Sequence, residues 1–245
     1  MENLSYISLS HQTALKRQMD VVANNIANMS TPGFKSQSVL FEEYVQNAGH
    51  GDKDPTGKFS QVLDRATWRN MDQGSLSMTG NPLDMAITGD AYFAIETEAG
   101  PRYTRAGNFS LNDRGEIVTA KGHLVEGEGG ALQIPEGDSQ IKIDKQGNLS
   151  TESGQIAKVR LVSFDNPQDL IATGDGMFRA EPGTEQDAPE GTEITQGALE
   201  GSNVKSIVEM TRMIDVLRTY QQVQKMVQGD HDRQRSAIRT LSQVN

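Results

Sequence analysis

The chain has 245 residues, no cysteine, a mean hydropathy of -0.56 and a formal net charge of -10. The missing cysteines exclude disulfides, thiolate metal sites and a cysteine nucleophile, and no segment approaches the roughly 18 to 20 apolar residues of a membrane span, so no membrane insertion is expected. Residues 1–40 carry three basic and two acidic residues and residues 201–245 carry seven and four, which leaves -14 for the middle and disfavours nucleic-acid binding.

The first strong pattern predicts an N-terminal helix. An apolar side chain recurs every three or four residues, at Leu15, Met19, Val22, Ile26 and Met29. This spacing places them along one side of a helix. We expect the helix to end near Asn28, because Thr31-Pro32-Gly33 follows and this tripeptide predicts a turn.

Three asparagines lie near the end of this predicted helix, at Asn24, Asn25 and Asn28. Asparagine is a mediocre helix former, so these side chains need hydrogen-bond partners. One interpretation is amide hydrogen bonding across a tight interface between subunits. The alternative is exposure to solvent near a fraying helix end.

The middle of the chain predicts β structure. Residues 36–75 are expected to form an extended connecting segment, in which Gly49 to Gly57 looks like a mobile loop, and residues 76–195 a β-rich body. The predicted strands are Ala91 to Glu96, Glu116 to Ala120, Gln140 to Ile143 and Ala157 to Phe164. Hairpin loops are expected at Asn112 to Gly115 and Asp144 to Asn148. Trp68 either anchors an interface or fills a core.

Residues 196–245 contain the second strong helical pattern. We expect a helix from about 203 to 228, capped by Ser202 and Asn203 and weakened at Gly229-Asp230. Its broad apolar face consists of Ile207, Met210, Met213, Ile214, Val216, Leu217, Tyr220, Val223 and Val227. The predicted fold is therefore a mainly β central domain with long α-helices at both chain termini, which could pair as a coiled-coil stem.

Catalytic patterns are missing from the sequence. The four histidines lie far apart, no pair has the spacing of metal ligands, and no Gly-x-Ser-x-Gly motif occurs, so we nominate no catalytic, cofactor-binding or metal residue. Two alternatives from other classes remain open. One is a secreted β-domain hydrolase with helical ends; the other is a carbohydrate- or peptidoglycan-binding module, which would need an aromatic platform on the β surface.

Several sequence blocks resemble the flagellar rod and hook proteins. The blocks, in chain order, are Ala23 to Asn28 with Thr31 to Lys35, Gln73 to Leu76 with Thr79 to Ile87, Tyr103 to Phe109, Gly115 to Thr119, Phe164 to Pro167, Gln196 to Glu200, Ser202 to Val204, and Glu209-Met210. They cover nearly the whole chain. The short body without a large insertion is more similar to the rod than to the hook proteins, and most similar to the proximal-rod subunit that adjoins the distal rod.

This resemblance implies a structural subunit, not an enzyme, that polymerises helically into the periplasm-spanning drive shaft and export channel used for motility. Its implied partners are copies of itself, other rod subunits and the flagellar type III export apparatus. Export without a cleaved signal peptide is expected, because Met1 to Ser10 lacks a basic start and an apolar core. A distal-rod or hook paralogue is the alternative within the family.

The two terminal helices are the predicted assembly interface. Their apolar faces can pair within the chain and then pack head to tail on neighbours, and such contacts generate open helical filaments. The predicted interface residues are Leu15, Met19, Val22, Asn24, Asn25, Ile26, Asn28, Met29, Ile207, Met210, Met213, Ile214, Leu217, Tyr220, Val223 and Val227. Periodicity alone favours a helical hairpin packed on its own β domain, and it is the family resemblance that favours assembly instead.

Overall fold

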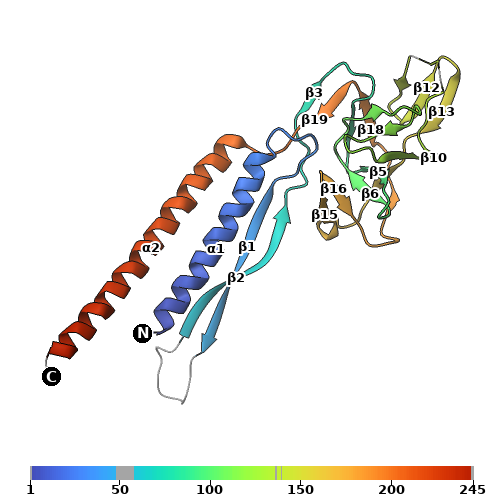
Figure 1. The fold of residues 1–245 in the computed structure, drawn as a ribbon. Helices are drawn as coiled ribbons and strands as arrows, with labels where there is room; N and C mark the ends of the chain where they lie inside the picture. Colours follow the sequence, from blue (N-terminus) through green and yellow to red (C-terminus); the bar gives the residue numbers. More distant parts are fainter. Residues whose placement is uncertain (1, 48–57, 136, 139, 244–245) are drawn as a thin grey trace. The chain divides into compact units, whose positions relative to one another are not determined.

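A computed structural model describes residues 2–47, 58–135, 137–138 and 140–243 (Figure 1). It is mainly β, with helix α1 (Glu2–Ala27) and helix α2 (Ser206–Gln243) in the two end regions. The chain divides into two compact units. The helical unit comprises Met1–Ala27, Gln37–Arg69 and Lys205–Asn245, and the β unit comprises Asn28–Ser36 and Asn70–Val204.

The helical unit has three layers. Strands β1 (Gln37–Asn47) and β2 (Lys58–Arg69) pair antiparallel as a two-stranded ribbon, with an irregularity between Leu40 and Phe41. Helix α1 contacts both strands and α2, and it lies between the ribbon and α2 in Figure 1. The ribbon falls within the segment that the sequence analysis describes as an extended connection. The predicted mobile loop, Gly49 to Gly57, lies outside the described residues.

A small apolar cluster joins the two helices. Leu15 of α1 is buried together with Val216 and Val223 of α2, and Met19 and Tyr220 pack against them half-buried. The predicted end of α1 is confirmed to within one residue. Helix α2 is longer than the predicted 203 to 228, because it continues without a break through Gly229-Asp230 to Gln243. A single glycine costs a helix only about 1 kcal/mol, which a helix of this length tolerates.

The β unit is built from short strands, and its largest sheet follows the order β15-β16-β6-β5-β9-β8-β7, with β10, β14 and β17 attached. The remaining strands form a three-stranded sheet, β11-β12-β13, and two pairs, β18-β4 and β19-β3. Their bounds are β3 (Leu76–Met78), β4 (Met85–Thr88), β5 (Tyr92–Glu96), β6 (Arg102–Thr104), β7 (Ser110–Leu111), β8 (Ile117–Val118), β9 (Leu124–Gly127), β10 (Gly130–Ala131), β11 (Lys142–Ile143), β12 (Asn148–Thr151), β13 (Gly154–Lys158), β14 (Leu161–Ser163), β15 (Ile171–Gly174), β16 (Met177–Arg179), β17 (Gln186–Asp187), β18 (Glu193–Gln196) and β19 (Ala198–Glu200).

The strands of the β unit enclose their own core. The largest fully buried apolar side chains include Phe93, Ile95, Ile117, Leu132 and Leu149. Both predicted hairpin loops are confirmed. Asn112–Gly115 connects β7 to β8 and Asp144–Gly147 connects β11 to β12, each closed by a backbone hydrogen bond from the glycine N–H to the first residue's carbonyl.

Candidate assembly surface

Asn25 joins three segments of the helical unit. Its side chain is fully buried; it donates to the Gln37 carbonyl at 2.8 Å and to Glu209 Oε2 at 3.1 Å, and it accepts from the Gln37 N–H at 2.9 Å. The second Glu209 oxygen accepts from Arg212 at 2.8 Å. The amide of Asn25 thus holds α1 to the start of β1 and to the first turn of α2.

The other two asparagines are placed differently. Asn24 is exposed on α1, and Asn28 is half-buried in the β unit, where its side-chain oxygen accepts from the Thr31 hydroxyl at 3.1 Å. The three asparagines therefore do not share one environment, although they share one sequence block.

The predicted apolar residues of α1 lie mostly inside the chain. Leu15 and Val22 are buried, Met19 and Ile26 are half-buried, and Met29, which follows the helix, is 41% exposed. The N-terminal stripe is thus largely occupied by contacts within the subunit.

Helix α2 has two apolar sides with different surroundings. The side formed by Val216, Tyr220 and Val223 packs on α1. A second group is exposed and recurs at spacings of three, four and three, and we call it the outer α2 stripe: Ile207, Met210, Ile214 and Leu217, with exposed fractions of 80%, 46%, 50% and 39%. Of the remaining predicted residues, Met213 is half-buried and Val227 is exposed.

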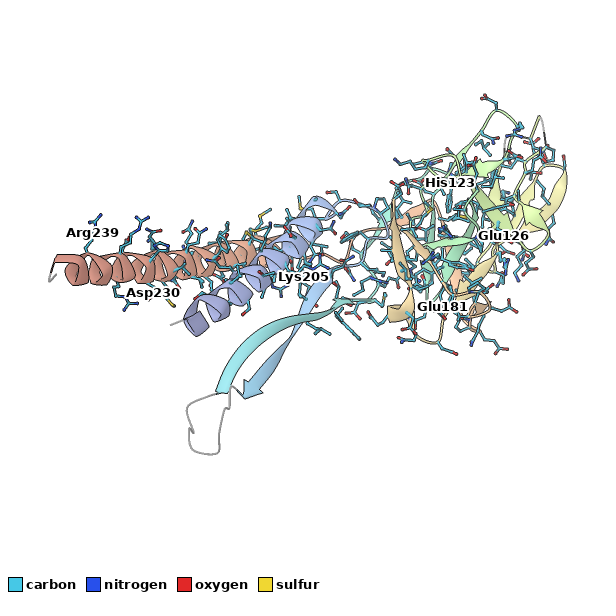
Figure 2. All side chains as sticks on the ribbon, turned by 60° about the horizontal axis from the view of Figure 1, so that its bottom comes forward. His123, Glu126, Glu181, Lys205, Asp230 and Arg239 are labelled. Atoms are coloured by element: carbon cyan, nitrogen blue, oxygen red, sulfur yellow. The ribbon has the colours of Figure 1, made fainter. Side chains whose placement is uncertain are left out.

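The charged side chains of α2 accompany these apolar sides without covering the stripe. Arg218 and Lys225 are exposed and fall on the same half of the helix as the stripe at 100° per residue. Figure 2 shows further charged side chains, Asp230 and Arg239 among them, projecting from α2 toward its C-terminal end. Within the part of α2 that is described, the stripe is an uninterrupted apolar surface of about three turns.

The predicted turn at Thr31-Pro32-Gly33 is confirmed in the β unit. Phe34 N–H bonds to the Thr31 carbonyl, and Gly33 N–H bonds to the Glu200 carbonyl at 2.8 Å. Gly33 has a φ of +67°, and a Cβ there would lie 2.5 Å from the Ala106 nitrogen. Only glycine fits this turn, because an added methyl group would collide with backbone that cannot move aside.

A buried ionic triad, which the sequence analysis did not identify, lies beside this turn. Glu200 binds Lys35 through one oxygen at 2.7 Å and Arg105 through the other at 3.0 Å, and all three side chains are at most 5% exposed. Lys35 also donates to the Asp72 carbonyl at 2.8 Å, and Arg105 to the Gly89 and Ala91 carbonyls. Burial lowers the pKa of Lys35, against the opposing effect of its bond to Glu200.

The predicted capping of α2 by Ser202 and Asn203 is wrong. The helix begins at Ser206, and the Asn203 side chain accepts from Ser36 N–H at 2.7 Å and donates to the Asn70 and Asp72 carbonyls. Asparagine satisfies backbone groups in many settings, so its position before a helical pattern did not identify which groups it would bind.

No helix among the described residues is long and apolar enough to cross a membrane. The described side chains also form no group of three or more His, Asp or Glu that could hold a metal ion. His123, Glu126 and Glu181 project from separate places of the β unit in Figure 2.

Known protein families match this chain in three places. Three family descriptions match: "Flagella basal body rod protein" at residues 6–35, "Flagellar hook protein FlgE/F/G D1 domain" at residues 86–151, and "Flagellar basal body rod FlgEFG protein C-terminal" at residues 195–240. The flagellar basal-body rod protein FlgF of Caulobacter vibrioides is 34% identical over 247 residues, which cover 100% of both chains. The chain belongs to the flagellar basal-body rod protein family.

Other rod proteins match almost as completely. FlgF of Mesorhizobium japonicum is 37% identical over 246 residues, or 98% of each chain, and FlgG of Caulobacter vibrioides is 34% identical over 242 residues, or 89% of this chain and 91% of its own. The family resemblance drawn from the sequence blocks is confirmed. This rod protein is a structural protein of the flagellar basal body and not an enzyme, so the hydrolase alternative is wrong.

Proposed function

We propose that this rod protein is the proximal-rod subunit that adjoins the distal rod. In this proposal it polymerises helically into a shaft that crosses the periplasm, transmits rotation and encloses the export channel. Full-length similarity to several FlgF proteins supports this choice within the family, although FlgG proteins also match over about nine-tenths of the chain.

The outer α2 stripe is the observation that carries the assembly mechanism. Four large apolar side chains on one side of α2 remain exposed after the helix has packed on α1. Burying a fully exposed side chain of this kind contributes about 1.5 to 3 kcal/mol, and roughly half of that remains to be gained at Met210, Ile214 and Leu217, which are already partly buried, before the entropic cost of association. Contact with a different surface on a neighbour would repeat from subunit to subunit and would build an open helical filament.

The buried and the exposed apolar residues of the terminal helices would have different roles. Buried residues such as Leu15, Val22 and Val223 would hold α1 and α2 together as the coiled-coil stem, while exposed residues such as Ile207 and Leu217 would contact neighbours. In this scheme residues 1–35 and 196–245 are the assembly segments, residues 36–75 are the connecting segment, and residues 76–195 form the body. We also propose export through the flagellar type III apparatus without a cleaved signal peptide, on the strength of the family resemblance.

Substitution of Leu217 tests the assembly mechanism directly. Losing a buried leucine costs about 2 to 5 kcal/mol, and burying an unpaired ammonium costs several more, so Leu217→Lys should prevent incorporation into rods and abolish motility. Since Leu217 is 39% exposed in the subunit, thermal unfolding of the monomer should change little.

Arg218→Lys is the matched control, because it preserves charge at the next position of the same helix. Motility assays and electron microscopy of basal bodies that carry a labelled subunit provide the measurements. Normal rods built from Leu217→Lys protein would contradict the proposal. So would label that remains in the cytosol when the unsubstituted subunit is used.

A further inference from the structure

The β1–β2 ribbon has an exposed apolar face. Successive side chains of a strand point to opposite faces, and the pairs Ser38↔Trp68 and Leu40↔Ala66 place these four residues on the same face. Trp68 is 50% exposed, Leu40 is 48% exposed, and Ala66 is exposed. We call these three residues the outer ribbon face.

Helix α1 occupies the opposite face of the ribbon. Arg17 of α1 donates to the hydroxyl of Thr67 at 3.4 Å, and Thr67 is the strand neighbour of Trp68. Val39, the strand neighbour of Leu40, is half-buried on that side. Where its side chains are described, the ribbon therefore packs a helix on one face and leaves Leu40 and Trp68 exposed on the other.

An exposed tryptophan beside an exposed leucine differs from an ordinary solvated strand. Leu40 lies diagonally across from Trp68, since Ser38 is the direct partner of Trp68, and diagonal neighbours are close enough to share one patch. Tryptophan is enriched among the residues that dominate interface energies. A patch of this composition is suited to packing against another apolar surface.

The outer ribbon face and the outer α2 stripe lie on opposite sides of α1. Helix α1 lies between the ribbon and α2, so one subunit cannot bring its own two surfaces together (Figure 1). Both surfaces nevertheless lie near the same end of the helical unit. Asn25 near the end of α1 binds Gln37 beside the first ribbon pair and Glu209 within the span of the stripe.

We propose that the outer ribbon face receives the outer α2 stripe of a second copy of this chain. The proposal rests on the assembly function proposed above and names the surface that the stripe contacts. Two subunits placed side by side with little axial offset would continue the layers ribbon, α1 and α2 into the ribbon of the next subunit. Because the two surfaces differ, each subunit binds one neighbour on each side and the series stays open.

The contact would be small. Three ribbon residues and four helix residues bury less than the roughly 1,200 Å² of a typical stable complex, so dilute subunits should remain monomeric. In a filament the same contact is repeated among subunits already held by others, which raises its effective concentration. Cooperative growth is the expected behaviour.

Engineered cysteine pairs test the contact, because the chain has no cysteine of its own. In the full-length protein, Trp68→Cys combined with Ile214→Cys should give disulfide-linked multimers when polymers form under oxidising conditions. A bond within one subunit is excluded, since α1 separates the two positions by two packed layers of about 10 Å each and a disulfide needs Cα atoms within about 7 Å.

Trp68→Cys combined with Asp215→Cys is the matched control. Asp215 is exposed and adjacent to Ile214, but it points about 100° away around the helix, so this pair should cross-link far less. A second variant, Trp68→Ser, should reduce the polymer yield about tenfold or more while leaving monomer unfolding unchanged, because the side chain is half exposed. Thr67→Ser on the inner face is its control.

The outcomes separate this inference from the proposed function. Multimers specific to the Ile214 pair, together with poor assembly of Trp68→Ser, would support the contact. No cross-link above the Asp215 control would overturn it, whatever Trp68→Ser does. If Leu217→Lys still blocks assembly in that case, the function proposed for the stripe stands; if Leu217→Lys assembles normally, both proposals fail.

Discussion

Glu200 is the residue on which two buried cations depend. One carboxylate pairs with both Lys35 and Arg105, so two cations share a single buried negative charge. The three members are therefore not equivalent. Removing Lys35 leaves a neutral Arg105–Glu200 pair, whereas removing the carboxylate charge leaves two buried cations.

We expect Glu200→Gln to destabilise the β unit by about 3 to 5 kcal/mol, the cost typical of a broken buried ion pair. Lys35→Met should cost less, about 1 to 3 kcal/mol, because it removes hydrogen bonds but leaves no uncompensated charge. Glu193→Gln, in the exposed pair with Lys145, is the control and should cost less than about 1 kcal/mol. Urea unfolding of the three variants gives the ranking, and equal losses for Glu200→Gln and Lys35→Met would contradict this account.

Because of Tyr103, the stability of the β unit should decrease as the pH rises through the alkaline range. Its ring is 3% exposed, and burial, reinforced by the charge of Glu185, raises the pKa of its hydroxyl above the ordinary 10.0. The unfolded chain therefore loses this proton first, so the stabilisation is complete below pH 10.0 and is lost as the pH rises toward the folded pKa.

The Tyr103→Phe variant isolates this effect. Between a pH below 10.0 and a pH above 10.0, its free energy of unfolding should fall less than that of the unsubstituted protein. Denaturant titrations at the two pH values measure this difference. Tyr220, half-buried on α2, supplies the matched variant Tyr220→Phe. An equal alkaline loss in the Tyr103→Phe and unsubstituted proteins would show that Tyr103 is not responsible.

At the scale of elements, Asn25 links α1, β1 and α2. Asn25→Asp keeps the shape of the side chain, but it cannot donate to the Gln37 carbonyl and it sets a carboxylate against Glu209. We expect a loss of several kcal/mol in the helical unit, since a buried charge would face a like charge. Asn24→Asp, at the exposed neighbouring position, should change stability by only about 0.5 kcal/mol.

Circular dichroism at the helical minimum follows this loss during urea unfolding. Asn25→Ala, which removes the same donor hydrogen bonds without adding a charge, should lose less stability than Asn25→Asp. Equal losses in the two variants would indicate that the lost hydrogen bonds, and not charge repulsion, dominate.

The two helices show which features of the fold could be predicted from the sequence and which could not. Apolar periodicity predicted both helices, because Leu15, Val216 and Val223 recur at the spacing that packing requires. It could not predict that α2 would split its apolar residues between an inner and an outer side, since both sides satisfy the same period. The triad was equally hidden, because Lys35, Arg105 and Glu200 are distant in sequence and charged residues are usually exposed.

At the scale of the whole molecule, the two units differ in the core that each encloses. The β unit buries the large cluster around Phe93 and Ile95, whereas the apolar cluster found among the described side chains of the helical unit is small and consists of Leu15, Val216 and Val223. Helices held by a small apolar cluster gain little further stability from helix propensity alone. Stability should therefore be unevenly distributed along the chain.

Amide hydrogen exchange measures this difference. In the monomer, amides of α2 beyond Val223 should exchange much faster than those of β5 and β9, and assembly should slow exchange along residues 207–217. The buried strand β5, whose exchange should not change on assembly, is the internal reference. Equal protection of α2 before and after assembly would mean that the helix gains no contacts in the polymer.

The placement of Glu200 also has a mechanical consequence. Lys35 lies two residues before β1, and Glu200 lies six residues before α2. Their ion pair therefore joins the two chain segments that lead from the β unit into the helical unit. A force on either segment is shared with the other through the Glu200 carboxylate. It is also transmitted to Arg105 of the β unit, which binds the same carboxylate. If the subunit transmits torque as proposed above, strain would therefore be shared among the segments that hold Lys35, Glu200 and Arg105 and would not fall on one segment alone.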